Sequence, residues 1–234
     1  MTDPVFLITG ASAGIGAATA RHAAEAGYRV VLAARRADRL AALADELGGA
    51  RRALPVPCDV TDWTQVSALV ERARAEFGRV DVAFANAGVS VGGTFLGGQA
   101  DPDDWREMVL ANVYGPAITA RAALPALVET RGHLLFTGSG AGRGVRPGNL
   151  YSATKWALTG MAQNIRAECV GTGVRVTIVQ PGQVATDMQR GNRTDAPMLS
   201  ADDVARAVLY AVAQPSEVDV NEILLRPTGQ DPHR

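Results

Sequence analysis

The sequence has little of what disulfide-rich, metal-binding and nucleic-acid-binding proteins require. It holds two cysteines and three histidines in 234 residues. Two cysteines are too few for a disulfide framework and fit a reducing compartment, and the scattered histidines have no metal-ligand spacing. Lys and Arg number 23 against 24 Asp and Glu, so no excess of positive charge favours a polyanion. We therefore expect no metal ion and no nucleic-acid partner.

Long apolar runs are also missing. A membrane helix needs about 18 consecutive apolar residues, and no run in this chain approaches that length. The opening "MTDPVFLITG" has no basic region, and its apolar run is too short for a signal peptide. These features predict a cytoplasmic protein with no membrane partner.

What the chain does contain is a regular alternation of short β-branched runs and longer helical patterns. Strands are expected at 5–9, 29–34, 53–57, 80–85, 133–137, 174–179 and 222–226. Helices are expected at 14–26, 37–48, 63–78, 103–130 with an interruption near Asn112, from about 151 onward, and at 201–213. This order predicts one α/β domain over 1–234, a Rossmann-like doubly wound parallel sheet of about seven strands with helices on both faces. The aperiodic segment 183–200 is the expected substrate loop.

A glycine or polar residue follows each of the first six expected strands. These residues are Gly10, Arg35, Asp59, Asn86, Ser139 and the pair Pro181-Gly182. In a doubly wound sheet such positions lie along the carboxyl edge, where ligands bind.

The segment "TGASAGIG" (9–16) joins the first strand to the first helix, with glycines at 10, 14 and 16. Glycine allows close backbone approach, and a helix N-terminus offers free N–H groups to a phosphate. The spacing differs from G-x-G-x-x-G, so a purely structural tight turn is the alternative.

The second strand ends in "AARR", where dinucleotide-binding folds that prefer NAD commonly carry an acid. Ala34 cannot bond a ribose hydroxyl, whereas Arg35 and Arg36 supply charge for a 2′-phosphate. The pattern favours NADP(H) over NAD(H), mainly through Arg35. A solvated surface arginine is the alternative.

The segment "YSATK" places Tyr151 and Lys155 four residues apart at the start of a helix, and therefore on one face. A phenol has a reference pKa of about 10, and a nearby cation would lower it toward the working pH of a general acid/base. Ser139 ends a neighbouring strand, where its hydroxyl could bond a substrate oxygen. Taken singly, each residue has an ordinary alternative: an interface tyrosine, a solvated lysine or a turn serine.

In combination, these segments resemble the short-chain dehydrogenase/reductase family over essentially the whole chain. The matching pieces are "TGASAGIG", "CDVTD" (58–62), "NAG" (86–88), "LANVYG" (110–115), "TGSGAG" (137–142), "YSATK" and "QPGQVATD" (180–187). The segment 203–230 is similar to members of NADP-preferring type that act on 3-hydroxy acids and small alcohols.

The resemblance implies a role for each matching residue. Tyr151 would be the general acid/base and Ser139 would orient the carbonyl. Lys155 would hold the nicotinamide ribose and lower the tyrosine pKa, and Asn112 would position a water that links Lys155 to bulk solvent. The implied cofactor-binding residues are Gly10, Ser12, Gly14, Ile15, Gly16, Arg35, Arg36, Asp59, Val60, Asn86, Ala87, Gly88, Tyr151, Lys155, Pro181, Gly182, Val184 and Thr186.

Substrate identity stays open at this point. Gly138 stands where family members usually have a serine, which is expected to open the substrate pocket slightly. Arg143, Arg146 and Arg190 fall in segments expected near the pocket, where a substrate carboxylate could bind, although solvated or interface arginines are equally compatible.

The leading interpretation is an NADP(H)-dependent carbonyl reductase or alcohol dehydrogenase acting on a small molecule. A 3-oxoacyl thioester reductase and a non-catalytic dinucleotide-sensing protein are the alternatives. The resemblance also implies a homotetramer or homodimer formed through the helices at about 103–130 and 151–170.

Overall fold

A computed structural model describes residues 3–98, 101–187 and 197–230 of the chain. In this part of the chain, seven strands form one sheet in the order β3-β2-β1-β4-β5-β6-β7, and every neighbouring pair is parallel. The strands are β1 (Val5–Thr9), β2 (Arg29–Ala34), β3 (Ala53–Pro57), β4 (Val82–Ala85), β5 (His133–Thr137), β6 (Arg175–Pro181) and β7 (Glu222–Leu225). The predicted fold class is confirmed.

The strand order reverses between β1 and β4. The chain runs outward from β1 through β2 to β3, and then returns to place β4 on the other side of β1. Ile8 in β1 is accordingly in register with Leu32 of β2 and with Phe84 of β4. A crevice at the carboxyl ends of the strands forms at such a switch point, which fixes where a ligand binds.

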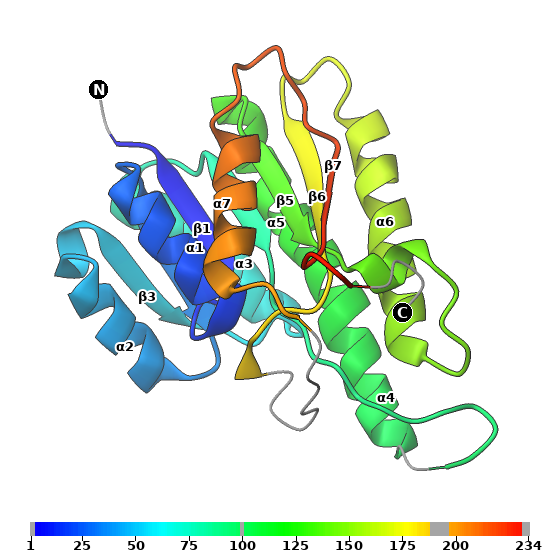
Figure 1. Cartoon of the computed structure of the whole chain (residues 1–234). Coiled ribbons are helices and arrows are strands. Elements are labelled where there is room, and N and C mark those ends of the chain that lie inside the picture. Colours follow the sequence, from blue (N-terminus) through cyan, green and yellow to red (C-terminus); the bar gives the residue numbers. More distant parts are fainter. Residues whose placement is uncertain (1–2, 99–100, 188–196, 231–234) are drawn as a thin grey trace.

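Helices cover both faces of the sheet (Figure 1). Their bounds are α1 (Gly14–Glu25), α2 (Ala37–Glu46), α3 (Trp63–Phe77), α4 (Pro102–Val109), α5 (Gly115–Thr130), α6 (Leu150–Glu168) and α7 (Ala201–Val212). Alternate residues of each strand point to opposite faces. Phe6 and Ile8 of β1 belong to a core shared with α1, α2 and α7, whereas Val5 and Leu7 belong to a core shared with α3, α5 and α6.

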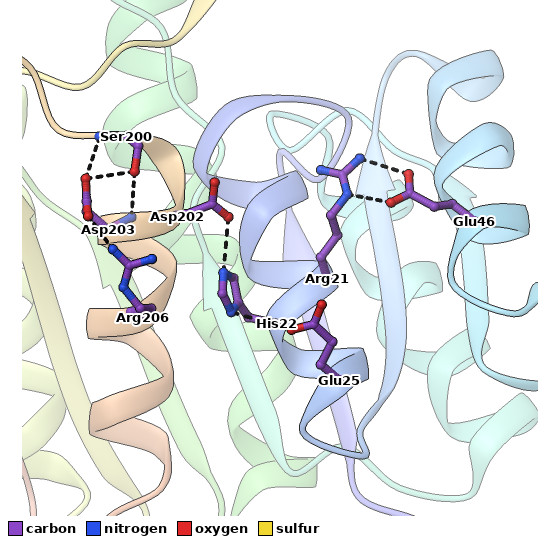
Figure 2. A network of polar contacts seen from close by, with 8 residues as sticks. All are labelled: Arg21, His22, Glu25, Glu46, Ser200, Asp202, Asp203 and Arg206. Carbon is purple, nitrogen blue, oxygen red and sulfur yellow. Dashed lines mark hydrogen bonds and ion pairs between the residues drawn. The ribbon is translucent and has the colours of Figure 1, made fainter.

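Polar contacts tie the three helices of one face together at their surface (Figure 2). Arg21 of α1 forms a two-pronged ion pair with Glu46 of α2, at 2.6 and 2.9 Å. His22 of α1 lies 3.1 Å from Asp202 of α7. Ser200 and Asp203 form a capping box that starts α7 directly after segment 183–200. Within that segment, residues 188–196 lie outside the described residues.

The long helical region between β4 and β5 changes its hydrogen-bonding pattern in the middle. After α4, a short π-helical segment, η2 (Leu110–Tyr114), leads into α5. The interruption predicted near Asn112 is therefore confirmed, and it takes the form of a π turn. Such turns are frequent at functional sites because they change the direction of one side chain.

Both cysteines are free and buried, as expected for small apolar side chains. Burial raises the pKa of the Cys58 thiol to about 11. In the described ranges, no helix combines the length and apolar character that a membrane crossing requires.

Candidate active site

Tyr151 and Lys155 lie on the first turns of α6. The helix begins at Leu150 because the Asn149 side chain caps it, with its Oδ1 accepting a 2.9 Å hydrogen bond from the Ser152 N–H. The Lys155 Nζ lies 5.6 Å from the centre of the Tyr151 ring. The predicted proximity of phenol and ammonium is confirmed.

Ser139 reaches the same place from the end of β5. It caps a short 3₁₀ segment, η3 (Gly140–Arg143), which lies directly on α6. The Ser152 hydroxyl donates a 2.6 Å hydrogen bond to the Ala141 carbonyl. A Cβ on Gly142 would stand 2.7 Å from the Lys155 carbonyl oxygen, so only glycine allows this close approach.

The pKa of Tyr151 differs from the prediction. Burial raises it above the usual value, while a hydrogen bond from the Ser139 side chain and the positive charge of Arg146 act in the opposite direction with smaller effect. The lowering expected from Lys155 is therefore wrong for the chain by itself. The physical reason is that α6 and η3 partly shield the phenol from water, and this effect exceeds those of the polar and charged groups around it.

Lys155 is buried as a whole side chain and donates a 2.8 Å hydrogen bond to the Thr137 carbonyl at the end of β5. Burial lowers its pKa to about 8, so the ammonium form still predominates at neutral pH. Because the buried Lys155 ammonium has one hydrogen bond among the described residues, a polar or charged ligand placed beside it would change its pKa.

Asn112 is buried in the π turn, and its amide is fully engaged. Its Nδ2 donates to the Val89 carbonyl at 2.8 Å and to Thr154 Oγ1 at 3.1 Å, and its Oδ1 accepts from the Val89 N–H at 2.8 Å. Asn112 thereby connects η2 to α6 and to the chain that leaves β4. A Cβ on Gly88 would stand 3.0 Å from Asn112 Oδ1 and 3.7 Å from Lys155 Nζ, so both groups lie beside Gly88.

The glycine loop 9–16 approaches the end of β4 more closely than any side chain would allow. Gly10 has a φ of +69°, and a Cβ on it would stand 2.9 Å from Ala87 Cα. A Cβ on Gly16 would collide with the Gly10 carbonyl and stand 2.7 Å from Asn86 Nδ2. The N-terminus of α1 is thus held open at the switch point, as a phosphate-binding loop requires.

Asn86 joins three strands at this edge. Its Nδ2 donates to the Thr9 carbonyl at 2.9 Å, and its Oδ1 accepts from Thr137 Oγ1 at 2.9 Å. The Thr137 carbonyl in turn accepts from Lys155. One chain of hydrogen bonds therefore runs from the glycine loop to the catalytic candidate Lys155.

The two arginines after β2 have different surroundings. Both are exposed, but the Arg36 guanidinium donates to Ser12 Oγ in the glycine loop at 2.9 and 3.3 Å. Arg36 is therefore fixed beside the loop that sequence analysis assigned to phosphate. Sequence reasoning gave the larger weight to Arg35.

The remaining cofactor candidates follow β3, β4 and β6. Asp59 Oδ1 accepts from Thr61 N and Oγ1 at 2.9 and 2.8 Å, and Val60 lies against Gly115 at the start of α5. Thr186 lies across from Gly14, where a Cβ would be 3.1 Å from its methyl group. Ala87 and Gly88 continue from Asn86, Ile15 lies in α1 beside Gly14, and Pro181, Gly182 and Val184 lead from β6 toward Thr186. All of them lie at the carboxyl edge.

The expected effect of Gly138 is wrong. A Cβ at this position would stand 2.9 Å from Ile178 Cδ1 and 3.0 Å from Gln180 Cγ. The space beside Gly138 that a side chain would take is filled by side chains of β6, so the glycine leaves no open space there.

Three residues that hold the site in place were missed by sequence reasoning. They are Thr137, Thr154 and Gly142, which contact Lys155 or Asn112. Small residues of these types occur throughout the chain, and only the packing of α6 on η3 and η2 marks them. In the described residues, no group of three or more His, Cys, Asp or Glu side chains has an arrangement that could hold a metal ion.

Comparison with known proteins places these features in a family. A family model described as short chain dehydrogenase matches residues 4–197. An uncharacterized oxidoreductase of Staphylococcus aureus (strain MRSA252) is 39% identical over 230 residues, which cover 97% of this chain and 98% of that protein.

Solved structures agree with the sequence relatives. The alcohol dehydrogenase of the archaeon Thermococcus sibiricus, complexed with 5-hydroxy-NADP, superposes with a TM-score of 0.90 at 32% identity and covers 99% of both chains. The closed form of a serine dehydrogenase complexed with NADP+ gives a TM-score of 0.89 at 30% identity, over 97% of this chain and 96% of that one. The chain therefore belongs to the short-chain dehydrogenase family.

Proposed function

We propose that this protein is an NADP(H)-dependent oxidoreductase that transfers a hydride between the nicotinamide and a small carbonyl compound or secondary alcohol. The observation that carries the proposal is the convergence of Ser139, Tyr151 and Lys155, from β5 and α6, on the sheet edge that also carries the glycine loop. Hydrogen bonds through Asn86 and Thr137 connect the two parts.

The residues at this edge fit a dinucleotide. The glycines at 10, 14 and 16 leave room that a Cβ would fill, and they present the N-terminus of α1 to a pyrophosphate. Arg36, held by Ser12, and its neighbour Arg35 would bind a 2′-phosphate. When bound, the cofactor supplies or accepts the hydride. The NADP complexes of the two similar structures support this choice of cofactor.

Tyr151 holds the proton for the carbonyl oxygen. Because burial raises its pKa, the phenol is protonated at neutral pH, which is the form that donates during carbonyl reduction. The Ser139 hydroxyl, hydrogen-bonded to the same phenol, would orient the carbonyl oxygen toward it. Lys155 would hold a ribose hydroxyl while its ammonium stays close to the phenol.

The proximity of these groups supports catalysis over mere dinucleotide sensing. A protein that only senses a dinucleotide has no use for a serine, a tyrosine and a lysine placed near one another at the end of the cofactor site. An acyl thioester is a further possible carbonyl substrate, so it belongs among the compounds to be tested.

We also propose that the protein forms a homotetramer or homodimer through α4, α5 and α6. Large apolar side chains on or beside these helices are exposed in the single chain, among them Tyr114, Val128 and Trp156. A monomer in light scattering of the purified protein would contradict this assembly.

Oxidation of NADPH, followed by absorbance with a panel of ketones, aldehydes, 3-oxo acids and acyl thioesters, tests the proposed activity. Tyr151→Phe is expected to lower kcat by about 10²-fold or more, because the general acid is lost, with the affinity for NADPH retained. Tyr210→Phe, at an exposed position on α7, is the matched control and should behave as wild type. Turnover of Tyr151→Phe near the wild-type rate would exclude the assignment of Tyr151, and inactivity of the wild type toward every compound would reject the proposed function.

A further inference from the structure

We propose that Arg146 binds a carboxylate of the substrate, so that the compounds this enzyme reduces or oxidises are oxo acids and hydroxy acids. The inference rests on the proposed function for the reaction itself and adds the substrate class and the residue that selects it. It follows from the separate surroundings of the three arginines near the site.

Arg143 is committed elsewhere. Its Nε donates to Glu222 Oε1 at 2.7 Å, and its second nitrogen contacts Glu222 Oε2. Gln180 Nε2 also donates to Glu222 Oε1 at 2.7 Å, so this cluster joins η3 to β6 and β7 as a closed structural unit. Arg190 lies outside the described residues. Arg146 is therefore the arginine of this group that the structure shows close to Tyr151.

Arg146 is short of a partner. Its Nε is buried and has no hydrogen-bond partner among the described residues, although its backbone carbonyl accepts from the Asn149 N–H at 3.1 Å. A buried guanidinium donor without an acceptor is unfavourable, and a carboxylate is the group that completes it best, with two parallel N–H···O bonds. An anionic substrate would supply the hydrogen-bond acceptor that Arg146 Nε lacks.

The charge around Arg146 favours the same ligand. Residues 138–155 contain no Asp or Glu, and with Arg143 paired to Glu222 their remaining positive charges are Arg146 and Lys155. Residues 86–98 contain no charged side chain. Asp187, at the end of the described chain after β6, pairs with Arg39 of α2 at 3.5 Å. The site therefore has a net positive character that attracts an anion.

The position of Arg146 relative to Tyr151 suits one ligand that spans both. Arg146 stands five residues before Tyr151, and its positive charge is near enough to oppose, in small part, the rise that burial gives to the pKa of the phenol. A substrate whose carbonyl oxygen meets the phenol would thus carry its carboxylate to the guanidinium.

The segment that carries Arg146 is fixed on both sides. Gly148, with a φ of +73°, lies against Thr94, where a Cβ would be 3.1 Å from the Thr94 Cβ. The Trp156 indole donates to the Gly144 carbonyl at 3.3 Å. Pro147 further restricts the backbone. Because the backbone of this segment is fixed, only the Arg146 side chain loses freedom when it binds a ligand, which favours selectivity.

The test compares 3-oxobutyrate with its methyl ester, which has the same carbonyl group but lacks the negative charge and is larger by one methyl group. Wild-type protein should prefer the acid in kcat/KM by 10-fold or more. Arg146→Gln should lose about 10²-fold in kcat/KM for the acid, mainly through KM, and stay within about 3-fold for the ester. Arg146→Lys should recover part of the loss, because it restores the charge without the two-pronged geometry. Arg143→Gln, the matched control, should keep the wild-type preference.

A second readout does not need turnover. Calorimetric titration of propanedioate, with and without saturating NADP+, should show binding to wild type and to Tyr151→Phe but not to Arg146→Gln. Equal losses for acid and ester in Arg146→Gln, or no preference for the acid in wild type, would overturn the proposal. If no compound is turned over, the proposed function fails. In that case, propanedioate binding that depends on Arg146 would still support the anion site. No binding of propanedioate to wild type would reject the anion site.

Discussion

The two edges of the sheet handle their charged groups in opposite ways. At the amino edge, Asp81 accepts from the Val5 N–H at 2.8 Å and from both prongs of Arg79. Arg175 donates to carbonyls at the end of α7, and Arg166 donates to the Val176 carbonyl. These groups at the amino edge have partners within the protein. Arg29 Nε at the start of β2 is buried without a hydrogen bond, but its charge lies 3.6 Å from Asp3.

At the carboxyl edge the charged groups are left with fewer partners. The buried Lys155 ammonium has three protons to place and one hydrogen bond in the described structure, to Thr137, and Arg146 Nε has none there. The few partners of Lys155 and Arg146 support the proposed binding of cofactor and substrate at this edge, because an unsatisfied buried donor is costly unless a ligand completes it. Substitutions at the two edges should therefore have different consequences, on ligand binding at one and on stability at the other.

The largest effect is expected for Gly16→Ala at the carboxyl edge. The new Cβ would collide with the Gly10 carbonyl and displace the loop from Asn86, so NADPH affinity should fall by more than about 100-fold. Overpacking of this kind also lowers the free energy of unfolding by about 1–3 kcal/mol.

Gly160→Ala in α6 is the matched control, because nothing lies within 4 Å of the Cβ it would add. Better helix propensity should raise the free energy of unfolding by about 0.5–1 kcal/mol, with NADPH affinity unchanged. Fluorescence titration and urea unfolding measure the two quantities. Similar NADPH affinities for both alanine variants would contradict the assignment of cofactor binding to the glycine loop at the carboxyl edge.

Asp81→Ala tests the amino edge. Removing the carboxylate leaves the buried Val5 N–H and the Arg79 guanidinium without their acceptor, which should cost about 2–3 kcal/mol in urea unfolding. Asp81→Asn keeps one acceptor oxygen and should cost less. Because neither change touches the site, KM for NADPH and for the carbonyl substrate should stay at wild-type values. A change in KM without loss of stability would show that the edges are not separate.

His133 is a buried group at the amino edge, and its protonation in the unfolded chain makes the free energy of unfolding depend on pH. It is buried at the start of β5, with Nε2 2.7 Å from Thr177 Oγ1, and burial lowers its pKa to about 3. The unfolded chain takes up the proton near pH 6.5. Stability is therefore retained above pH 6.5 and lost as the pH falls below it toward 3.

His133→Gln removes this titration and keeps a polar group near Thr177. Between pH 7.5 and pH 5, wild type should lose about 2 kcal/mol more than the variant in urea unfolding, from about 1.4 kcal/mol per pH unit over the 1.5 units below 6.5. Equal losses would mean that His133 is protonated in the folded state. Kinetic constants at pH 7.5 should not distinguish the two proteins.

Much of the site could be predicted from sequence because it depends on position along strands. Each strand ends where its apolar run ends, so Gly10, Asp59, Asn86 and Ser139 had to meet at one edge once the sheet was parallel. The helix from 151 and the interruption at Asn112 are also local features. The pKa of Tyr151 was predicted in the wrong direction, because its solvent exposure depends on how η3 lies on α6. The effect of Gly138 was wrong for a similar reason, since Ile178 and Gln180 come from a strand some forty residues later.

Neighbours along the chain set the strand and helix pattern, the glycine loop, and the spacing of Tyr151 and Lys155, so these features could be read from the residues alone. Tertiary structure alone decided which arginine is held at the glycine loop, which is tied to Glu222, and which has a buried Nε without a hydrogen bond in the described residues. The physical reason is that burial and bonding partners decide the charge state of a side chain and whether its donors and acceptors have hydrogen bonds. In this fold those partners come from segments far away in sequence.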